Sequence, residues 1–370
     1  MQDIFKEALE IVSRGERAAL STIVSSKGSL PMSKKAKMLI RPDNKTVGTV
    51  GGGCLEADVW AEGRRVMETG VPNLQHFILT EKHAGEDGLN CGGNVEIFTE
   101  PITAEGSRPI LEEIIRLRRQ DRSAVLATLV SGEDSSAAKL LVHRDGTTFG
   151  TLGAPGLDLR VREEIGDEID ENLLKILNVE VETPAGPKEV RIFLESIVPA
   201  PALYLFGGGH VSLQIARIAK AVGFRIIVVD DRPMFANPER FPEADETHVL
   251  DMDTCFDALE IDEQSYLVAV TRGHQHDKPV IRQAVRTNAK YIGMIGSRRK
   301  IALMWKQLEE EGIPRARLEE VHAPIGLNIG ADNPEEIAVS VVAQLIAIRR
   351  SGGKPVHTEA MARETVSPLP

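Results

Sequence analysis

The sequence predicts an α/β protein in which a Rossmann-like, doubly wound parallel sheet follows an N-terminal α+β domain built from two duplicated units. Three observations lead to this prediction. Strand-like apolar runs alternate with helical segments from residue 201 onward, a glycine-rich turn follows the first of these strands, and short segments of residues 1–200 recur about 100 positions later.

The internal duplication is visible in four pairs of segments. AALSTIVS at 18–25 matches AVLATLVS at 124–131, KMLIRPD at 37–43 matches KLLVHRD at 139–145, VGTVG at 47–51 matches FGTLG at 149–153, and residues 94–102, which end in VEIFTEPI, match VRIFLESI at 190–197. From its apolar alternation each copy is predicted to form strand, strand, turn, helix and strand, with further helices at 2–14 and 109–119.

The two copies differ at the residues that carry chemistry. The first has an 11-residue insert, SKGSLPMSKKA at 26–36, where the second has the seven residues GEDSSAA. The first reads Gly51-Gly52-Gly53-Cys54-Leu55-Glu56 where the second reads Gly153-Ala154-Pro155-Gly156-Leu157-Asp158. Only the first has Asn90-Cys91-Gly92-Gly93 before its last strand. The chemically distinctive residues therefore belong to one copy of a shared scaffold.

A linker, Val198-Pro199-Ala200-Pro201, precedes the strand and helix alternation. The predicted domains are 1–104, the first repeat unit with both cysteine motifs; 105–200, a second, degenerate unit; 201–350, a Rossmann-like domain; and 351–370, a polar mobile tail. In the third domain strands are predicted at 202–206, 225–230, 247–251, 265–271 and 291–295, and helices at 211–222, 278–287, 298–311 and 334–349.

Composition excludes several classes of protein. Of 370 residues 42% are hydrophobic and 27% charged, as in ordinary globular proteins, and a net charge of −11 argues against nucleic acid as the main partner. No stretch approaches the roughly 20 apolar residues that span a bilayer, and the start of the chain lacks a signal-peptide layout, so a cytoplasmic protein is expected. Three widely spaced cysteines indicate neither a disulfide framework nor a zinc site.

The glycine-rich turn is the first candidate ligand site. Gly207-Gly208-Gly209-His210-Val211-Ser212 follows a buried-strand run and reads G-x-G-x-x-S, close to the dinucleotide fingerprint. Gly207 and Gly209 would permit a tight turn and the close approach of a phosphate to the helix start. Asp230 ends the second strand and could bind a ribose hydroxyl, whereas Arg232 could instead contact a phosphate. His210 either caps the turn or transfers protons.

Polar segments also follow the other strands of this domain, namely DDRP, TRGHQHD at 271–277 and GSRRK at 296–300. The carboxyl ends of parallel strands line one crevice, so His274, Ser297 and Arg298 join the candidate ligand-binding residues. The alternative is that these loops are simply solvated. A metal at His274, His276 and Asp277 is the less favoured interpretation, because no other cluster with ligand spacing supports it.

The first repeat carries a second candidate site. Gly51, Gly52 and Gly53 expose backbone N–H groups at a predicted helix start, a nest suited to an anion, and Lys37 lies beside the insert loop. Glu56 is either part of this site or only a helix-start acid. A thiolate at Cys91 could ligate a soft metal or carry sulfur. Cys54, next to the glycine nest at the predicted helix start, is either functional or structural, and Cys255 is interpreted as packing.

These residues together resemble the XdhC/CoxI family, accessory proteins for xanthine dehydrogenase and related molybdenum hydroxylases, over roughly residues 1–350. The motifs that carry the resemblance are Gly28-Ser29-Leu30-Pro31, Ala36-Lys37-Met38, the run from Gly51 to Glu56, Cys91-Gly92-Gly93, Gly207 to Val211, Asp230-Asp231-Arg232, Thr271-Arg272-Gly273-His274, Tyr291 to Arg298, His322 to Leu327 and Pro334 to Ala338. Met32 and Lys35 depart from the arginine and glycine that the family usually has there.

The resemblance implies binding of the molybdenum cofactor, as molybdopterin or its dinucleotide form, protection of it during sulfuration, and delivery to an apo molybdenum hydroxylase. It also implies a cysteine desulfurase as partner and places the cysteine that the family associates with cofactor binding at Cys91, which is therefore the candidate molybdenum ligand. Two alternatives stay open, an NAD(P)-dependent oxidoreductase using the crevice after residue 207 and a regulatory nucleotide sensor. No catalytic residue is assigned, and a homodimer is expected on base rates.

Overall fold

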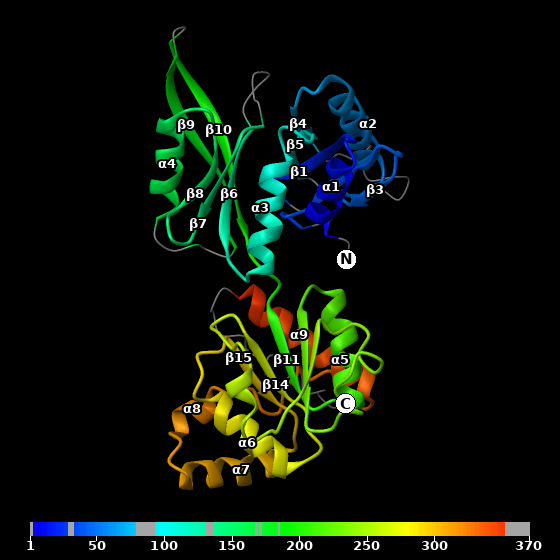
Figure 1. Ribbon diagram of the computed structural model, residues 1–370, viewed down its shortest axis with the longest axis vertical. Coiled ribbons are helices and arrows are strands. Elements are labelled where there is room, and N and C mark those ends of the chain that lie inside the picture. Colours follow the sequence, from blue (N-terminus) through cyan, green and yellow to red (C-terminus); the bar gives the residue numbers. More distant parts are fainter. Residues whose placement is uncertain are drawn as a thin grey trace, which may run out of the picture. The chain divides into compact units, whose positions relative to one another are not determined.

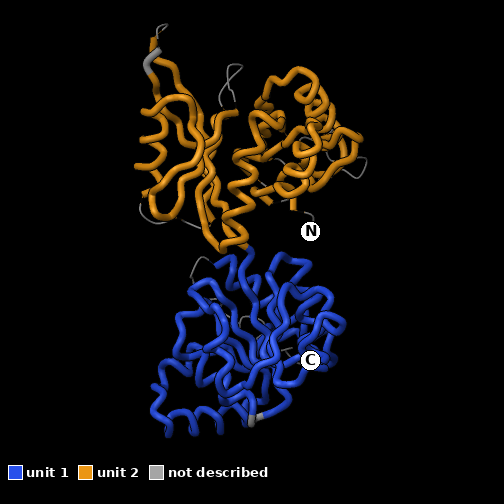
Figure 2. The backbone as a smooth tube through the Cα atoms, viewed as in Figure 1, with its two compact units in different colours: residues 1, 200–370 blue, residues 2–199 orange. Residues whose placement is uncertain are grey.

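The computed structural model describes residues 3–28, 33–78, 93–130, 137–166, 169, 172–183 and 186–351 (Figure 1). It divides into two compact units, residues 2–199 and residues 200–370 together with residue 1 (Figure 2). The first unit contains two antiparallel sheets and the second a parallel Rossmann sheet, which confirms the predicted fold class.

The first unit is built from two repeats of the same topology. Their five-stranded sheets have the orders β3-β2-β1-β5-β4 and β8-β7-β6-β10-β9, which place equivalent strands at equivalent positions. The first repeat consists of α1 (Ile4–Ser13), β1 (Ala18–Lys27), β2 (Lys37–Ile40), β3 (Thr46–Gly48), α2 (Cys54–Thr69), β4 (Asn73–Ile78) and β5 (Asn94–Ile102). The second consists of α3 (Arg108–Arg119), β6 (Ala124–Leu129), β7 (Lys139–His143), β8 (Thr148–Thr151), α4 (Pro155–Ile165), β9 (Leu174–Thr183) and β10 (Gly186–Ile197).

Each repeat has more strands than its sequence pattern predicts. The expected order of strand, strand, turn, helix and strand omits β3 and β4 in the first repeat and their equivalents β8 and β9 in the second. β3 has only three residues, too few for a visible alternation, and all four residues of β8 are exposed. β4 has no fully buried residue, so its alternation of apolar and polar side chains is weak.

The helices of the first unit form two kinds of layer. α1 and α3 pack against each other and fill a core shared by both sheets, whereas α2 and α4 cover the opposite faces of the first and second sheets (Figure 1). α1 begins where the Asp3 side chain accepts hydrogen bonds from the backbone N–H groups of Phe5 and Lys6. α2 ends at Gly70, whose φ of 71° suits the left-handed conformation of a helix C-terminus.

The second unit is a doubly wound parallel sheet. Its strand order, β13-β12-β11-β14-β15, reverses direction between β11 and β14, which is the switch point where ligands bind in such sheets. Its elements are β11 (Ala202–Phe206), α5 (His210–Ala221), β12 (Arg225–Asp230), β13 (Glu246–Val249), the 3-10 helix η2 (Cys255–Ala258), β14 (Tyr266–Ala269), α6 (His274–Ala284), β15 (Tyr291–Met294), α7 (Arg298–Glu310), α8 (Arg315–Glu319) and α9 (Pro334–Arg350).

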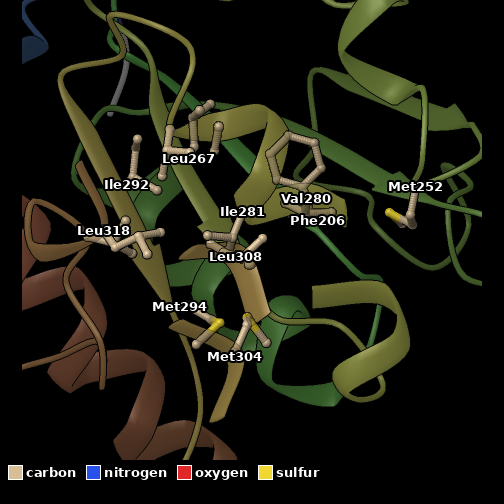
Figure 3. Close-up of a cluster of buried hydrophobic side chains, with 14 of the residues drawn as sticks. Phe206, Met252, Leu267, Val280, Ile281, Ile292, Met294, Met304, Leu308 and Leu318 are labelled. Carbon is tan, nitrogen blue, oxygen red and sulfur yellow. The ribbon is translucent and has the colours of Figure 1, made fainter. Parts of the chain in front are cut away.

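Apolar cores lie on both faces of this sheet. α6 and α7 cover one face, where Phe206, Leu267 and Met294 meet Ile281 and Leu308 (Figure 3). α5 and α9 cover the other face. Each fully buried side chain of this size contributes roughly 1.5–3 kcal/mol relative to exposure, so the sheet holds its strand ends in fixed positions. Within the described ranges, every helix is too short or too polar to cross a bilayer.

Candidate functional site

A polar cleft of about 460 Å³ opens between the two repeats of the first unit. Strands β1, β4 and β5 form one side and strands β9 and β10 form the other. Its volume falls in the range of pockets for small organic ligands. The residues that line it are Ser25, Lys27, His76, Asn94, Glu96, Ile176, Asn178, Glu189 and Arg191.

Alternation along β5 explains how the cleft is built. The side chains of every second residue from Asn94 to Ile102 point toward the second repeat. Asn94 and Glu96 line the cleft, Phe98 lies in an apolar cluster, and Glu100 forms an ion pair before Ile102 enters the shared core. One strand face therefore passes from open and polar to closed and apolar.

A β-bulge places the last residues of β1 in the same cleft. The pairing of β1 with β5 shifts between Ile23, opposite Ile97, and Ser25, opposite Glu96. Val24 and Ser25 are neighbours in the chain, but Val24 joins the cluster with Phe98 and Ser25 lines the cleft. The extra residue thus turns Ser25 and Lys27 away from the face that α2 covers, as bulges near binding sites often do.

An ion pair crosses the cleft from one repeat to the other. The guanidinium of Arg191 donates to both carboxylate oxygens of Glu96, with Nη1–Oε1 at 3.0 Å and Nη2–Oε2 at 2.7 Å. This contact lowers the pKa of Glu96 and outweighs burial, which alone would raise it. The same contact raises the pKa of Arg191. A bidentate pair of this kind fixes both side chains in position.

Lys37, a sequence candidate, lies deeper in the interface. Its Nζ donates to Glu195 Oε1 at 2.8 Å and to Thr22 Oγ1 at 3.2 Å, and its side chain is 10% exposed. Lys139 repeats the arrangement with Glu100 and Thr128. The ammonium of Lys37 thus has internal partners on the sheet face opposite α2, and contact with a cofactor would require that ion pair to open.

The glycine run is found at the start of α2. Gly51 and Gly53 have φ values of 157° and 62°, Gly52 is exposed, and Cys54 is an exposed free thiol at the first position of the helix. Glu56 accepts a hydrogen bond from Thr49. The second repeat has the same arrangement, because Thr151 Oγ1 donates to Asp158 at 2.8 Å. This shared arrangement gives Glu56 a role in closing the turn.

Cys91, the candidate molybdenum ligand, lies outside the described residues, as do Met32 and the segment 79–92 that joins β4 to β5. The described residues that flank it are Ile78 and Gly93, followed by Asn94 of the cleft. Within the described ranges, no three His, Cys, Asp or Glu side chains are grouped so that they could hold a metal ion.

The glycine-rich turn of the second unit is open on one side only. A Cβ on Gly209 would meet no atom within 4 Å, and His210 is exposed at the start of α5. A Cβ on Gly207 would instead lie 2.4 Å from the carbonyl oxygen of Val270, and one on Gly208 would lie 1.9 Å from that of Phe235. The loop after β12 therefore closes over Gly208 and leaves Gly209 accessible.

Asp230, the candidate ribose-binding acid, is 2% exposed and already has internal donors. It accepts hydrogen bonds from Gly208 N at 2.8 Å and from Arg232 through N, Nε and Nη2. Burial raises its pKa, but these hydrogen bonds outweigh burial, and the pKa lies below its ordinary value. Arg232 also stacks on Phe235 at 3.6 Å. A ribose hydroxyl of NAD(P) could reach Asp230 only if this ion pair opened.

Further polar side chains of this unit surround the same turn. Arg272 forms an ion pair with Asp231 at 2.8 Å, so the loops after β14 and β12 are joined. Buried Asp277 accepts hydrogen bonds from Thr271 Oγ1, at 2.5 Å, and from Lys300.

The remaining candidates belong to helix starts. Ser297 caps α7 by accepting from Lys300 N at 3.3 Å, and Arg298 follows it, exposed to solvent. His274 begins α6, but its side chain lies outside the described part of the structure.

Sequence reasoning missed the residues of the cleft. Ser25, His76, Asn94, Asn178 and Arg191 come from strands spread over more than 160 positions and form no motif. One signal was present in the aligned repeats. The segments VEIF and VRIF differ by an acid and a base at equivalent positions, which suits an ion pair between the two copies.

A duplicated α+β unit with a polar cleft is followed by a Rossmann unit with an accessible glycine turn, so the chain is a two-unit α/β protein. The chain belongs to the XdhC and CoxI family. The model of that family matches residues 11–77 and 117–176, one segment in each repeat. The model of the XdhC Rossmann domain matches residues 203–345.

Relatives along almost the whole chain agree with this membership. A probable xanthine dehydrogenase subunit from Bacillus subtilis (strain 168) is 28% identical over 340 residues, 90% of this chain and 94% of the relative. The molybdenum cofactor insertion chaperone PaoD of Escherichia coli (strain K12) is 21% identical over 352 residues, 94% of this chain and 88% of PaoD. The crystal structure of a xanthine dehydrogenase from Bacillus halodurans matches with a TM-score of 0.76 and 25% identity, covering 96% and 98% of the two chains.

Proposed function

We propose that this protein binds the molybdenum cofactor, protects it during sulfuration, and delivers it to a molybdenum hydroxylase of the xanthine dehydrogenase type. The similarity to a cofactor insertion chaperone over 94% of this chain is the observation that carries the proposal. The relative named as part of a xanthine dehydrogenase supports the class of client enzyme.

Two features of the first unit support binding of the cofactor there. Its cleft of about 460 Å³ is large enough for a pterin with a phosphate. Cys91 precedes Asn94 of the cleft by three positions, a reach of at most about 11 Å along an extended chain. A thiolate is a soft ligand that suits molybdenum, so we assign this role to Cys91 and keep Cys54, beside its glycine nest, as the second candidate.

The proposed sequence of steps requires two partners. Sulfuration needs a sulfur donor, for which a cysteine desulfurase is the proposed source, and delivery needs an apo molybdenum hydroxylase that accepts the cofactor. A dinucleotide form of the cofactor, or NAD(P), is the proposed ligand of the second unit at Gly209 and His210. A homodimer is part of the proposal only because dimers are the commonest assembly among soluble oligomeric proteins.

The test is cofactor retention by the full chain under anaerobic conditions. The protein is incubated with molybdenum cofactor and passed over a desalting column, and molybdenum and pterin are then measured in the protein fraction. We expect stoichiometric retention by the wild type and loss of molybdenum in Cys91→Ala. Cys255→Ala is the matched control, because this thiol is buried in the core of the other unit and should not affect retention.

Two outcomes would contradict the proposal. Absence of retention by the wild type, with cofactor that still activates an apo hydroxylase, would favour a nucleotide-dependent protein instead. Equal retention by wild type and Cys91→Ala would remove Cys91 from the site. Delivery is tested separately by adding loaded protein to the apo hydroxylase and following the appearance of its activity.

A further inference from the structure

The two repeats contribute different side chains at equivalent positions around the cleft. Glu96 of the first repeat is equivalent to Arg191 of the second, and Asn94 is equivalent to Glu189. His76 and Asn178 are a third equivalent pair, because His76 lies opposite Glu96 and Asn178 lies opposite Arg191. All six residues line the cleft. The cleft therefore lies where the two repeats meet face to face.

Deeper in the same interface the equivalent residues are identical. These pairs are Thr22 and Thr128, Lys37 and Lys139, Phe98 and Phe193, and Glu100 and Glu195. They form two reciprocal ion pairs, each of 2.8 Å, and one shared apolar cluster. The equivalent side chains of the two repeats are thus identical where the interface between the repeats is closed, and they differ where the cleft opens.

The differences give the cleft two chemically distinct sides. Arg191 and Glu96 hold each other in a bidentate pair, so neither needs a ligand for its charge. Glu189 adds an exposed carboxylate that can accept two parallel N–H bonds. The amides of Asn94 and Asn178 can both donate and accept. The lining therefore suits a flat, polar heterocycle with adjacent N–H donors and a carbonyl acceptor.

The cleft also offers a place for an anionic group. Lys27 lines it at the end of β1, where the bulge has turned its side chain toward the second repeat. Its ammonium can pair with a phosphate. Ile176 of β9 gives the cleft an apolar wall against which a ring can lie. A heterocycle and a phosphate can thus be bound within one volume of about 460 Å³.

The geometry points to this cleft as the site for the pterin end of a phosphorylated pterin cofactor, with Glu189 accepting from its 2-amino-4-oxopyrimidine edge and Lys27 facing its phosphate. The inference rests on the proposed function and adds to it the location and chemistry of the organic part. Guanine presents the same edge, so a guanine nucleotide is the competing source of this chemistry.

The test measures pterin binding without molybdenum. Neopterin monophosphate is fluorescent, so its anisotropy can be followed as the full-length protein is added. Loss of a hydrogen-bonded charge weakens binding at least about tenfold, which is the effect expected for Glu189→Gln. Glu163→Gln is the matched control, because Glu163 is an exposed carboxylate on α4, which covers the opposite face of the second sheet. This control should bind like the wild type.

The outcomes separate this inference from the proposed function. Saturable binding of neopterin monophosphate that Glu189→Gln weakens and excess GMP does not displace would support the pterin site. Tighter, Glu189-dependent binding of GMP would overturn the pterin assignment. Full retention of molybdenum cofactor by Glu189→Gln would overturn the inference and leave the proposed function standing. Failure of the wild type to retain the cofactor, with neopterin monophosphate still bound, would contradict the proposed function alone.

Discussion

Glu100→Gln removes one charge from a buried ion pair between the two repeats. Glu100 is 5% exposed, and its carboxylate accepts from Lys139 at 2.8 Å, while Lys139 is 12% exposed and also contacts Thr128 at 3.0 Å. Glutamine retains the volume and a hydrogen-bond acceptor but leaves the ammonium without a counterion. The void that these side chains line measures about 20 Å³, enough for a single water.

The expected cost follows from this environment. Removing one partner of a buried pair costs about 3–5 kcal/mol, and the slight exposure of Lys139 favours the lower end, near 3 kcal/mol. For a unit of this size that free energy corresponds to a fall of roughly 6–12 °C in the unfolding midpoint. The double variant Lys139→Met with Glu100→Leu should recover most of the loss, because no unpaired charge then remains buried.

The chain supplies its own reporters for this measurement. It has two tryptophans, Trp60 in α2 and Trp305 in α7, so each unit carries one. In a Trp305→Phe background, urea unfolding followed by fluorescence reports the first unit. Glu112→Gln is the surface control, since the pair of Glu112 with Arg108 is about half exposed and should contribute less than about 1 kcal/mol.

The second repeat contains an equivalent ion pair, which provides an independent test of the expected cost. Glu195 pairs with Lys37 at the equivalent position of the second repeat, also at 2.8 Å. Glu195→Gln should therefore cost the same as Glu100→Gln within about 1 kcal/mol. A cost below about 1 kcal/mol for both would show that these pairs contribute no more than surface pairs. A large difference between the two would refute the equivalence of the two halves of the interface.

Three further predictions use other parts of the molecule. Hydrogen bonds from Arg191 hold the pKa of Glu96 below its ordinary value of 4.5, so this pair stabilises the fold fully above that pH and loses its contribution as the pH falls through the lower folded-state pKa. The difference in urea midpoint between wild type and Glu96→Gln should thus shrink below pH 4.5, and a constant difference down to pH 3 would contradict this. Gly208→Ala should destabilise the second unit by more than about 2 kcal/mol, because its Cβ would lie 1.9 Å from a carbonyl oxygen. Gly209→Ala should change the free energy of unfolding by less than about 1 kcal/mol, because its Cβ would meet no atom within 4 Å. Both are measured by the fluorescence of Trp305 in a Trp60→Phe background. Burial raises the pKa of Cys255 to about 12, so its thiol should react poorly at pH 8. In the Cys91→Ala variant, a thiol reagent at pH 8 should therefore modify exposed Cys54 quickly and Cys255 only in denaturant. Rapid reaction of both cysteines would show that the core around Cys255 opens.

Much of the fold could be predicted because its strands and helices follow from patterns of neighbouring residues in the sequence. The buried run before Gly207 defined β11, and the segments that recur in both repeats placed equivalent strands in both sheets. The predicted strand at 225–230 agrees with β12 residue for residue. Short edge strands such as β3 were missed, since three residues cannot show an alternation.

The candidate site was less predictable, because side-chain partners come from distant segments. The pairing of Lys37 with Glu195 joins positions 158 apart, and no local pattern distinguishes such a lysine from one that binds a ligand. Asp230 lies at the end of its strand, as predicted, but its hydrogen bonds with Arg232 and Gly208 depend on the path of the following loop. The bulge that turns Lys27 into the cleft is likewise a matter of strand register.

The two covalently joined repeats allow what two identical protomers could not. On the twofold axis of a homodimer each side chain faces its own copy, so a glutamate would face a glutamate and repel it. Here Glu96 faces Arg191, and Asn94 and Glu189 occupy the two equivalent positions. Because the two halves differ at these positions, a ligand bound across the internal axis would have one preferred orientation. Each chain also carries both sides of the cleft, so the cleft does not depend on the pairing of two protomers.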